Sequence, residues 1–301
     1  MITSTSTVTV GLVGLGLMGR GLGLSLLRAG HRLQVLAHRQ RAVADELVAA
    51  GAHEVADAAA LAASADALVL CLPSAEAVDA VLFGPQGVCS GARPGLLVVE
   101  CSTLRPDVGR RLHAQLAAQH IAFVDAPVTR GPAEAVQGRL NALVGGDGAA
   151  VDRAEPLLRA FCEQVFRFGA VGQGYAAKLV NNFLAFSHLA AVTEAMHTAR
   201  RAGLPLPQLL AAIQVSGGQS RVLDGLTPLL AGTGPSRSRV TLRTAHKDVH
   251  YYGRLAQDLG SEGPLARQVQ ALLQQALDAG LADAFTPAWL DHVAGLPPGQ
   301  G

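Results

Sequence analysis

The chain has 301 residues, of which 50% are hydrophobic and 16% are charged, and its formal net charge is +1. This length suits one large domain or two ordinary ones. The balanced charge, without a basic block or a basic stripe interleaved with aromatic residues, argues against a nucleic-acid partner. The apolar runs are too short for a membrane span, and Met1–Ser6 lacks the charged start of a secretory signal.

The first half of the chain alternates short β-branched runs with helical stretches rich in alanine and leucine. The predicted strands are Val8–Val13, Leu33–Ala37, Ala67–Leu72, Leu96–Glu100, Ala122–Asp125 and Ala142–Val144. The helical stretches between the earlier strands include Met18–Ala29, Arg41–Ala50 and Pro106–Gln119. This alternation predicts βαβ units and a doubly wound, mostly parallel sheet with helices on both faces.

The second half of the chain lacks convincing strands. Tyr175–Ala202 predicts one long helix that ends before Gly203 and Pro205. The later predicted helices are Pro207–Val215, Val222–Leu230, His246–Leu259 and Pro264–Ala279, with a loop at Ala231–Arg239 and a disordered tail at Leu296–Gly301. We therefore expect an α/β domain over residues 1–173, followed by an all-α domain over residues 174–301.

A glycine-rich turn follows the first predicted strand and opens the first predicted helix. The segment Gly14-Leu-Gly16-Leu17-Met18-Gly19 fits the pattern G-x-G-x-x-G. Gly14 would make the tight turn, Gly16 would let the backbone approach a pyrophosphate, and Gly19 would let helix pack on strand. The helix N-terminus would hold the anion, which predicts a dinucleotide cofactor. The alternative is a purely structural turn.

The end of the second predicted strand bears on the choice of cofactor. NAD sites place an acid about twenty residues after the turn, on the ribose 2′-hydroxyl. The segment Leu36–Arg41 contains no acid, and His38, Arg39 and Arg41 could neutralise a 2′-phosphate. We therefore predict that NADP is preferred. The alternative is that these cations face solvent and that NAD binds.

The cysteines and histidines give no sign of a metal site. The four cysteines form no C-x-x-C pair, which indicates buried thiols in a reducing compartment, the cytoplasm. His246 and His250 have the spacing of a zinc helix, but Lys247 stands where H-E-x-x-H requires glutamate.

Lysine is rare in this chain. Arginine makes up 22 of the 24 Lys and Arg residues, and the two lysines are Lys178 and Lys247. A guanidinium cannot give up its proton in a protein, whereas an ammonium can. The two positions are therefore candidates for proton transfer, the alternative being chance.

Several segments together carry a family resemblance. They are Gly11–Gly19, Asp125-Ala-Pro-Val-Thr-Arg-Gly131, Gly172-Gln-Gly-Tyr-Ala-Ala-Lys-Leu-Val-Asn-Asn182 and His246-Lys-Asp248. In order and spacing they resemble the β-hydroxyacid dehydrogenase family, which includes 3-hydroxyisobutyrate dehydrogenase and tartronate semialdehyde reductase. The resemblance covers nearly the whole chain. It implies a Rossmann domain, a helical domain that begins with a long interdomain helix, and a homodimer or homotetramer built through the helical part.

The resemblance assigns roles to both lysines. Lys178 matches the catalytic acid/base, a role that hydride transfer from an alcohol requires because the hydroxyl proton needs an acceptor. Asn181 and Asn182 share its helix face and would hold the substrate hydroxyl or the lysine. Lys247 would close over the nicotinamide end of the cofactor. The alternatives are local helix hydrogen bonds for the asparagines and a surface ion pair between Lys247 and Asp248.

The substrate-anion loop departs from the family pattern D-A-P-V-S-G-G. Thr129 keeps a hydroxyl and Gly131 matches, but Arg130 replaces a glycine. Arginine binds carboxylates, sulfonates or phosphates through two N–H groups. Arg130 resembles the sulfonate-binding arginine of the sulfolactaldehyde reductase branch, although Thr129 differs from that branch's glycine. The alternative is an Arg130 that points to solvent.

By the same resemblance Leu72, Pro73 and Thr103 would contact the cofactor from the ends of two strands. The activity implied is NAD(P)-dependent hydride transfer to or from a small anionic β-hydroxy acid or semialdehyde, in a cleft between the domains. Two alternatives remain open: an imine reductase, which usually lacks the lysine, and a non-catalytic nucleotide-binding module.

Overall fold

The computed structural model describes residues 7–293, so the expectations for Met1–Ser6 and Leu296–Gly301 lie outside the described residues. The chain divides into two compact units, Met1–Lys178 and Leu179–Gly301. None of the described helices is long and apolar enough to cross a membrane.

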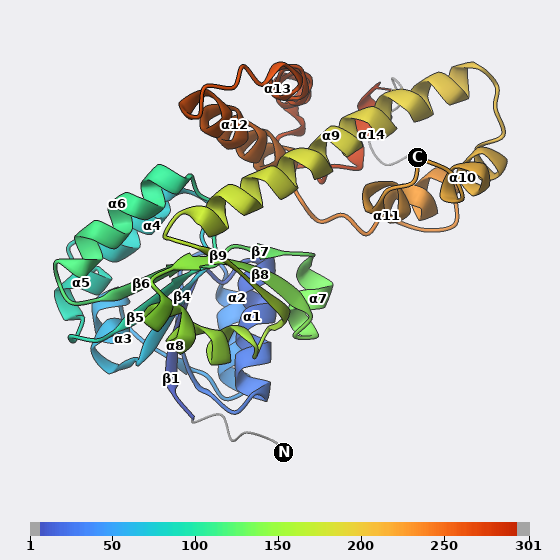
Figure 1. The fold of residues 1–301 in the computed structure, drawn as a ribbon. Helices are drawn as coiled ribbons and strands as arrows, with labels where there is room; N and C mark the ends of the chain where they lie inside the picture. The colour runs from blue at the N-terminus through green and yellow to red at the C-terminus, as the bar shows by residue number, and fades with distance from the viewer. Residues whose placement is uncertain (1–6, 294–301) are drawn as a thin grey trace. The chain divides into compact units, whose positions relative to one another are not determined.

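The first unit is built on one sheet (Figure 1), whose described strands run in the order β3-β2-β1-β4-β5-β6-β8-β7, with β9 paired to β8. Pairings from β3 through to β6 are parallel; β8 is antiparallel to β6 and β7 and parallel to β9. The strands are β1 (Thr9–Val13), β2 (Arg32–Leu36), β3 (His53–Glu54), β4 (Ala67–Leu70), β5 (Leu97–Glu100), β6 (Ala122–Asp125), β7 (Val128–Thr129), β8 (Leu140–Gly146) and β9 (Cys162–Gly169).

Helices cover both faces of this sheet. The helices of the first unit are α1 (Leu17–Arg28), α2 (Arg41–Ala49), α3 (Ala58–Ser64), α4 (Ala75–Phe83), α5 (Val88–Gly91), α6 (Pro106–Ala117), α7 (Pro132–Val136) and α8 (Gly148–Leu158). One core contains Leu12 of β1 with side chains of α1, α2, α7 and α8. The other contains Val13 with side chains of α3, α4, α5 and α6. The side chains of neighbouring residues in β1 thus pack on opposite faces of the sheet, as the two-residue period of a strand requires.

Every residue of the central strands β4 and β5 is buried. Such strands read as unbroken apolar runs, and this explains why the sequence identifies them without alternation. Glu100, at the last position of β5, is the one polar residue in these two strands, and it is fully buried as well.

The second unit is helical in its described residues. Helix α9 (Gln173–Arg201) begins in the first unit and continues into the second. It is followed by α10 (Leu206–Gln214), α11 (Arg221–Leu230), α12 (Leu242–Asp258), α13 (Pro264–Ala276), the π-helical turn η1 (Leu277–Leu281) and α14 (Ala288–Val293). A third core, which includes Met196, Leu242 and Trp289, belongs to this unit.

The predicted fold class is confirmed: a mostly parallel α/β sheet is followed by helices. All six predicted strands are present, with bounds shifted by a few residues. The short strands β3 and β7 and the longer β9 were missed. Helix α12 begins at Leu242, four residues before its predicted start, because the Thr241 hydroxyl caps it by accepting from the Thr244 N–H.

Candidate functional site

The glycine turn lies between β1 and α1, and two of its glycines, Gly14 and Gly19, are required sterically. Gly14 has φ +98°, and a Cβ there would lie 2.1 Å from the Cys71 carbonyl oxygen. A Cβ on Gly19 would lie 1.8 Å from the Gly14 carbonyl oxygen. A Cβ on Gly16 would meet nothing within 4 Å, so this backbone is open to a ligand. The residues between them differ: Leu17 is 55% exposed and Met18 is partly buried.

This turn suits a dinucleotide phosphate. Gly16 occupies the N-cap position of α1, where no side chain accepts a hydrogen bond from the helix and the first turn contains no acid. The N–H groups of that turn therefore remain for an anion, which the helix dipole favours as well.

The cations after β2 have different environments. The Arg41 guanidinium contacts Asp45 at 2.7 Å and Glu54 at 2.6 Å, so its charge is compensated within the protein. His38 and Arg39 are both exposed, and they precede α2. Of the cations considered for a 2′-phosphate, these two are better placed than Arg41.

The loops after β4 and β5 are joined at the carboxyl edge of the sheet. The Leu72 N–H donates to Ser102 Oγ at 2.8 Å. Pro73 follows Leu72 and Thr103 follows Ser102, so the predicted contacts lie on adjacent loops. β4 is also the neighbour of β1, and a Cβ on Gly14 would lie 3.2 Å from Leu72 Cδ2. The glycine turn and these loops therefore meet at one edge.

Two buried carboxyl groups stand at the ends of β5 and β6. Glu100 accepts from the Ser102 N–H and from the Tyr175 hydroxyl, the latter at 2.5 Å. Asp125 accepts from the N–H groups of Gly172 at 2.8 Å and Tyr175 at 3.0 Å. Burial raises the pKa of Glu100 to about 7 and that of Asp125 to about 6, although these donors oppose the shift. Neither acid was predicted as a site residue, yet an acid that ends an apolar strand is a signal for one.

Lys178 is partly buried and lies against residues 125–131, the predicted substrate-anion loop. Its Nζ donates to the carbonyl oxygen of Val128 at 2.7 Å. The next residue, Thr129, has its Oγ1 3.3 Å from the Asn141 amide nitrogen, which donates to it. The Lys178 amine is therefore held beside the residue that precedes Thr129.

The other two residues of this loop are engaged by acids. Arg130 has φ +74°, and its Nη1 donates to Glu163 Oε2 at 2.6 Å and to the Arg139 carbonyl oxygen at 2.5 Å. The Gly131 N–H donates to Glu134 Oε2 at 3.1 Å. Arg130 therefore does not simply point to solvent: its guanidinium is paired with the carboxylate of Glu163.

The remaining predicted residues gather in the second unit around Asp248, which is 2% exposed. Asn182 Nδ2 donates to Asp248 Oδ2 at 2.6 Å, and Lys247 Nζ lies 3.0 Å from Asp248 Oδ1 in an ion pair. Asn181, which is exposed, donates to Asn182 Oδ1 at 3.0 Å. Lys247 Nζ is also 5.0 Å from the ring centroid of Tyr251. Asp248 thus orients an asparagine and a lysine together.

The structure also bears on a possible metal site and on the state of the cysteines. Within residues 7–293, no group of three or more His, Cys, Asp or Glu residues is arranged to hold a metal ion. The four cysteines are free; Cys101 and Cys162 are buried, and the other two are partly buried.

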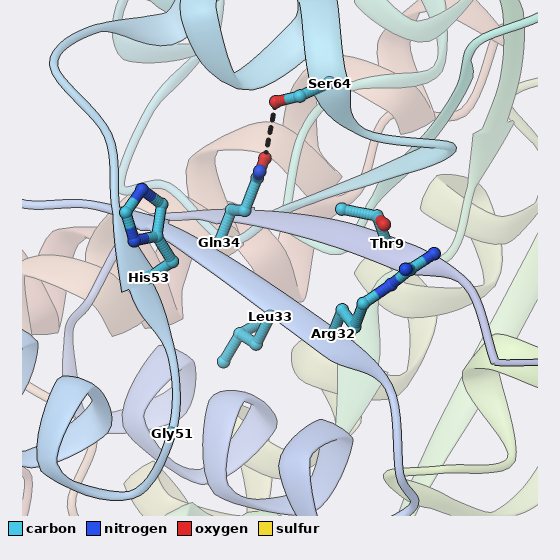
Figure 2. A pocket seen from close by; sticks show the side chains of 7 residues that line it. All are labelled: Thr9, Arg32, Leu33, Gln34, Gly51, His53 and Ser64. Carbon is cyan, nitrogen blue, oxygen red and sulfur yellow. Dashed lines mark hydrogen bonds between the residues drawn. The ribbon is translucent and has the colours of Figure 1, made fainter.

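The first unit also has a hollow of about 390 Å³ at the amino ends of β1, β2 and β3 (Figure 2). It is lined by Thr9, Arg32, Leu33, Gln34, Gly51, His53 and Ser64. Gln34 and Ser64 are hydrogen-bonded across it at 2.8 Å. Because parallel strands place their carboxyl ends at the other edge, this hollow is separate from the predicted site.

Comparison with known proteins agrees with the fold. Residues 9–169 match the family model for the NAD binding domain of 6-phosphogluconate dehydrogenase. Residues 172–292 match the model for NAD-binding of NADP-dependent 3-hydroxyisobutyrate dehydrogenase. The fold and the glycine turn thus define an NAD(P)-binding oxidoreductase.

Individual relatives narrow the class. L-threonate dehydrogenase of Escherichia coli (strain K12) is 34% identical over 95% of each chain. 3-Sulfolactaldehyde reductase of the same strain is 32% identical over 94% of this chain and 95% of that protein. The crystal structure of 3-hydroxyisobutyrate dehydrogenase from Salmonella typhimurium is 31% identical, covers 95% of this chain and 99% of that one, and has a TM-score of 0.85. The chain belongs to the β-hydroxyacid dehydrogenase family.

Imine reductases are more distant. The one from Myxococcus stipitatus in complex with NADP+ is 20% identical with a TM-score of 0.65, a likeness that shows the fold alone. The sequence-based preference for a hydroxyacid dehydrogenase over an imine reductase is therefore confirmed.

Proposed function

We propose that this enzyme moves hydride between NADP and the carbinol carbon of a small anionic β-hydroxy acid or its semialdehyde, with Lys178 as the acid/base. The observation that carries the proposal is the hydrogen bond from Lys178 Nζ to Val128, which holds the amine beside the anion loop. The relatives add support: their names include L-threonate dehydrogenase, 3-sulfolactaldehyde reductase and 2-hydroxy-3-oxopropionate reductase.

The residues that would hold the cofactor are those at the carboxyl edge of the sheet. The α1 N-terminus at Gly16 suits the pyrophosphate, while Arg39 and His38 suit a 2′-phosphate. The bound nicotinamide supplies hydride in one direction and accepts it in the other. We assign Leu72, Pro73 and Thr103 as further contacts on the adjacent loops, and Lys247 from α12.

Lys178 would accept or donate the proton of the reaction. In alcohol oxidation its neutral amine takes the hydroxyl proton as hydride departs, and the resulting ammonium returns that proton to solvent. In aldehyde reduction the ammonium gives a proton to the forming alkoxide. Thr129, Arg130 and Gly131 would hold the substrate anion. Asn181 and Asn182, which follow on the same helix, would orient the hydroxyl.

The test is a spectrophotometric screen with hydroxy acids, semialdehydes, sulfonates and cyclic imines, each with NAD(H) and NADP(H). Lys178→Ala and Lys178→Arg are run in parallel. We expect kcat to fall roughly a hundredfold or more in both variants, because arginine keeps the charge but cannot transfer the proton. Cofactor affinity, measured by fluorescence titration, should change little.

The screen separates the alternatives. Wild-type turnover retained by Lys178→Ala would refute the acid/base role. A non-catalytic module would bind the cofactor without turnover in any form. Reduction of cyclic imines in preference to the semialdehydes would indicate an imine reductase.

Two properties complete the proposal. A homodimer or homotetramer built through the helical unit is consistent with the uncharged, exposed positions on α9. The cytoplasm is consistent with the four free cysteines.

A further inference from the structure

Glu100 is a buried carboxylate that the proposed chemistry does not use. It is fully buried and receives three donors: the Ser102 N–H, the Ser102 hydroxyl and the Tyr175 hydroxyl. A carboxylate with several donors is satisfied as an acceptor, whereas a protonated carboxyl group must displace one of them. The three donors therefore favour the ionised form of Glu100, whereas its burial favours the neutral form.

Through these partners Glu100 joins segments that are distant in sequence. Ser102 Oγ, which donates to Glu100, also accepts from the Leu72 N–H at 2.8 Å. The Tyr175 hydroxyl reaches Glu100 across 75 positions of sequence. The loops after β4 and β5 and the first turn of α9 thus share one carboxylate.

Tyr175 is held by two hydrogen bonds, one from its backbone N–H and one from its side-chain hydroxyl. Its N–H donates to Asp125 Oδ2 at 3.0 Å, which anchors the start of α9 near the helix axis. Its hydroxyl, at the far end of the side chain, is held by Glu100. A bond near the axis fixes where the helix begins, and a bond far from the axis fixes how the helix is rotated about it.

The rotation of α9 matters because Lys178 is three residues beyond Tyr175, on the same helix face. Lys178 Nζ reaches Val128, three residues after Asp125. Asp125, the start of α9, Lys178 and Val128 therefore form a closed ring of covalent and hydrogen bonds.

The space around Tyr175 is shaped for its ring. Tyr175 is fully buried, and a Cβ on Gly109 of α6 would lie 2.7 Å from Tyr175 Cε2. A phenylalanine would fill that space as well. Packing alone therefore does not explain the hydroxyl, which would be costly to bury without Glu100.

We propose that Glu100 and Tyr175 are positioning residues, which set the rotation of α9 and so the place of Lys178 Nζ beside Val128 and the anion loop. This inference rests on the proposed function of Lys178. Neither residue touches the substrate in this proposal.

The proposal has a consequence for pH. Burial raises the pKa of Glu100 to about 7, so the group titrates in the working range. The other titratable groups around it are Asp125, Tyr175, Cys71 and Cys101, and Cys71 also interacts electrostatically with Lys178. Burial keeps both thiols neutral, because it raises the pKa of Cys71 to about 12 and that of Cys101 well above its usual range.

Aldehyde reduction isolates this effect. In that direction Lys178 must carry its proton, so acid does not remove its function, whereas acid does protonate Glu100. We expect kcat for reduction to fall as the pH is lowered through about 7.

The experiment uses Tyr175→Phe, Glu100→Gln and the double variant, assayed for aldehyde reduction across this pH range. Tyr175→Phe should lower kcat roughly tenfold to a hundredfold, since small misplacements of catalytic groups have effects of this size. The dissociation constant for NADPH should stay within about twofold. Glu100→Gln should lose the acidic limb, and the double variant should be no slower than the slower single variant, because both act through one hydrogen bond.

Leu82→Ala is the matched control, because Leu82 is fully buried in the same core and has no part in the network. It should lower the unfolding temperature and keep wild-type kcat. Wild-type kcat in Tyr175→Phe, or an acidic limb that persists in Glu100→Gln, would overturn the proposal. Lys178→Ala is assayed beside them: full activity in that variant would refute the proposed function itself, separately from the positioning roles.

Discussion

At the residue scale, Arg39 is better placed than Arg41 to bind the 2′-phosphate of NADP. Arg39 is exposed after β2, whereas Arg41 is paired with Asp45 and Glu54. Arg39→Asp should raise the KM for NADP relative to the KM for NAD roughly tenfold to a hundredfold. The variant loses a charge-assisted hydrogen bond to the 2′-phosphate and adds a repulsion between that phosphate and the new carboxylate. Arg41→Ala should change that ratio little. Steady-state kinetics with both cofactors decide, and an unchanged ratio in Arg39→Asp would refute the assignment.

Arg130 gives a second prediction at this scale, because Glu163 competes for its guanidinium. The pair is partly exposed, with 27% of the Arg130 side chain and 46% of the Glu163 side chain accessible. Pairs of this kind are worth about 1 kcal/mol or less, so removing the competitor should have a small effect.

Glu163→Gln should therefore lower KM for the anionic substrate by at most about fivefold, with kcat unchanged. Arg130→Ala should raise KM for the same substrate. Glu155→Gln is the control, since Glu155 pairs with Arg159 and Arg167 instead. If KM responds to neither Glu163→Gln nor Arg130→Ala, then Arg130 does not bind the substrate anion.

The residues that sequence reasoning could and could not find differ in the distance to their partners. Lys178 and its asparagines stand in one contiguous segment, so their spacing is visible in the sequence. Glu100 and Glu163 act on residues 75 and 33 positions away. Such partners become neighbours only once the sheet has formed. The place of Glu100 at the end of an apolar strand marks it as a candidate site residue, but it does not identify the residue that Glu100 contacts.

At the element scale, the strands that could be predicted are the buried ones. β4 and β5 are apolar runs, whereas β9 has the exposed, mixed sequence Cys162-Glu-Gln-Val-Phe-Arg-Phe-Gly169 of an edge strand that pairs only with β8 among the described strands. β3 and β7 have two residues each, too few for a periodic pattern. Burial on two faces, and not strand propensity alone, is what the sequence reveals.

The start of α9 yields a prediction about stability and pH. Asp125 accepts two N–H groups there, and burial raises its pKa from the ordinary 3.8 to about 6. A raised carboxyl pKa means that the native state binds more protons than the unfolded state between these values. Stability from this group is therefore present at low pH and lost as the pH rises.

Chemical unfolding of wild type and Asp125→Asn at several pH values checks this. The difference in unfolding free energy, wild type minus variant, should decrease by an amount on the order of 3 kcal/mol between about pH 4 and pH 7, because each pKa unit is worth about 1.4 kcal/mol. Taking the difference cancels the groups that the two proteins share, including His31 and His246, whose pKa values burial lowers. A difference that is constant with pH, or that grows, would contradict the role of Asp125.

At the scale of the whole molecule, α9 is the element shared by both units, and its accessible positions in the second unit are suited to a protein contact. Val180 is 47% exposed and Leu184 is 52% exposed, and Ala191 and Ala195 are exposed further along. These four residues recur at intervals of a helical turn or two, so they lie along one stripe. An apolar stripe of this length that includes alanines allows another helix to approach closely.

We expect this stripe to be the contact through which copies of the chain associate. Ala191→Glu should place a charge in the contact and reduce the mass in solution, measured by light scattering after gel filtration, from a dimer or tetramer to a smaller species. Arg201→Glu, at an exposed position at the end of the same helix, changes charge outside the stripe and should leave the mass unaltered. A wild-type chain that is already monomeric, or an Ala191→Glu variant with wild-type mass, would show that α9 is not the contact.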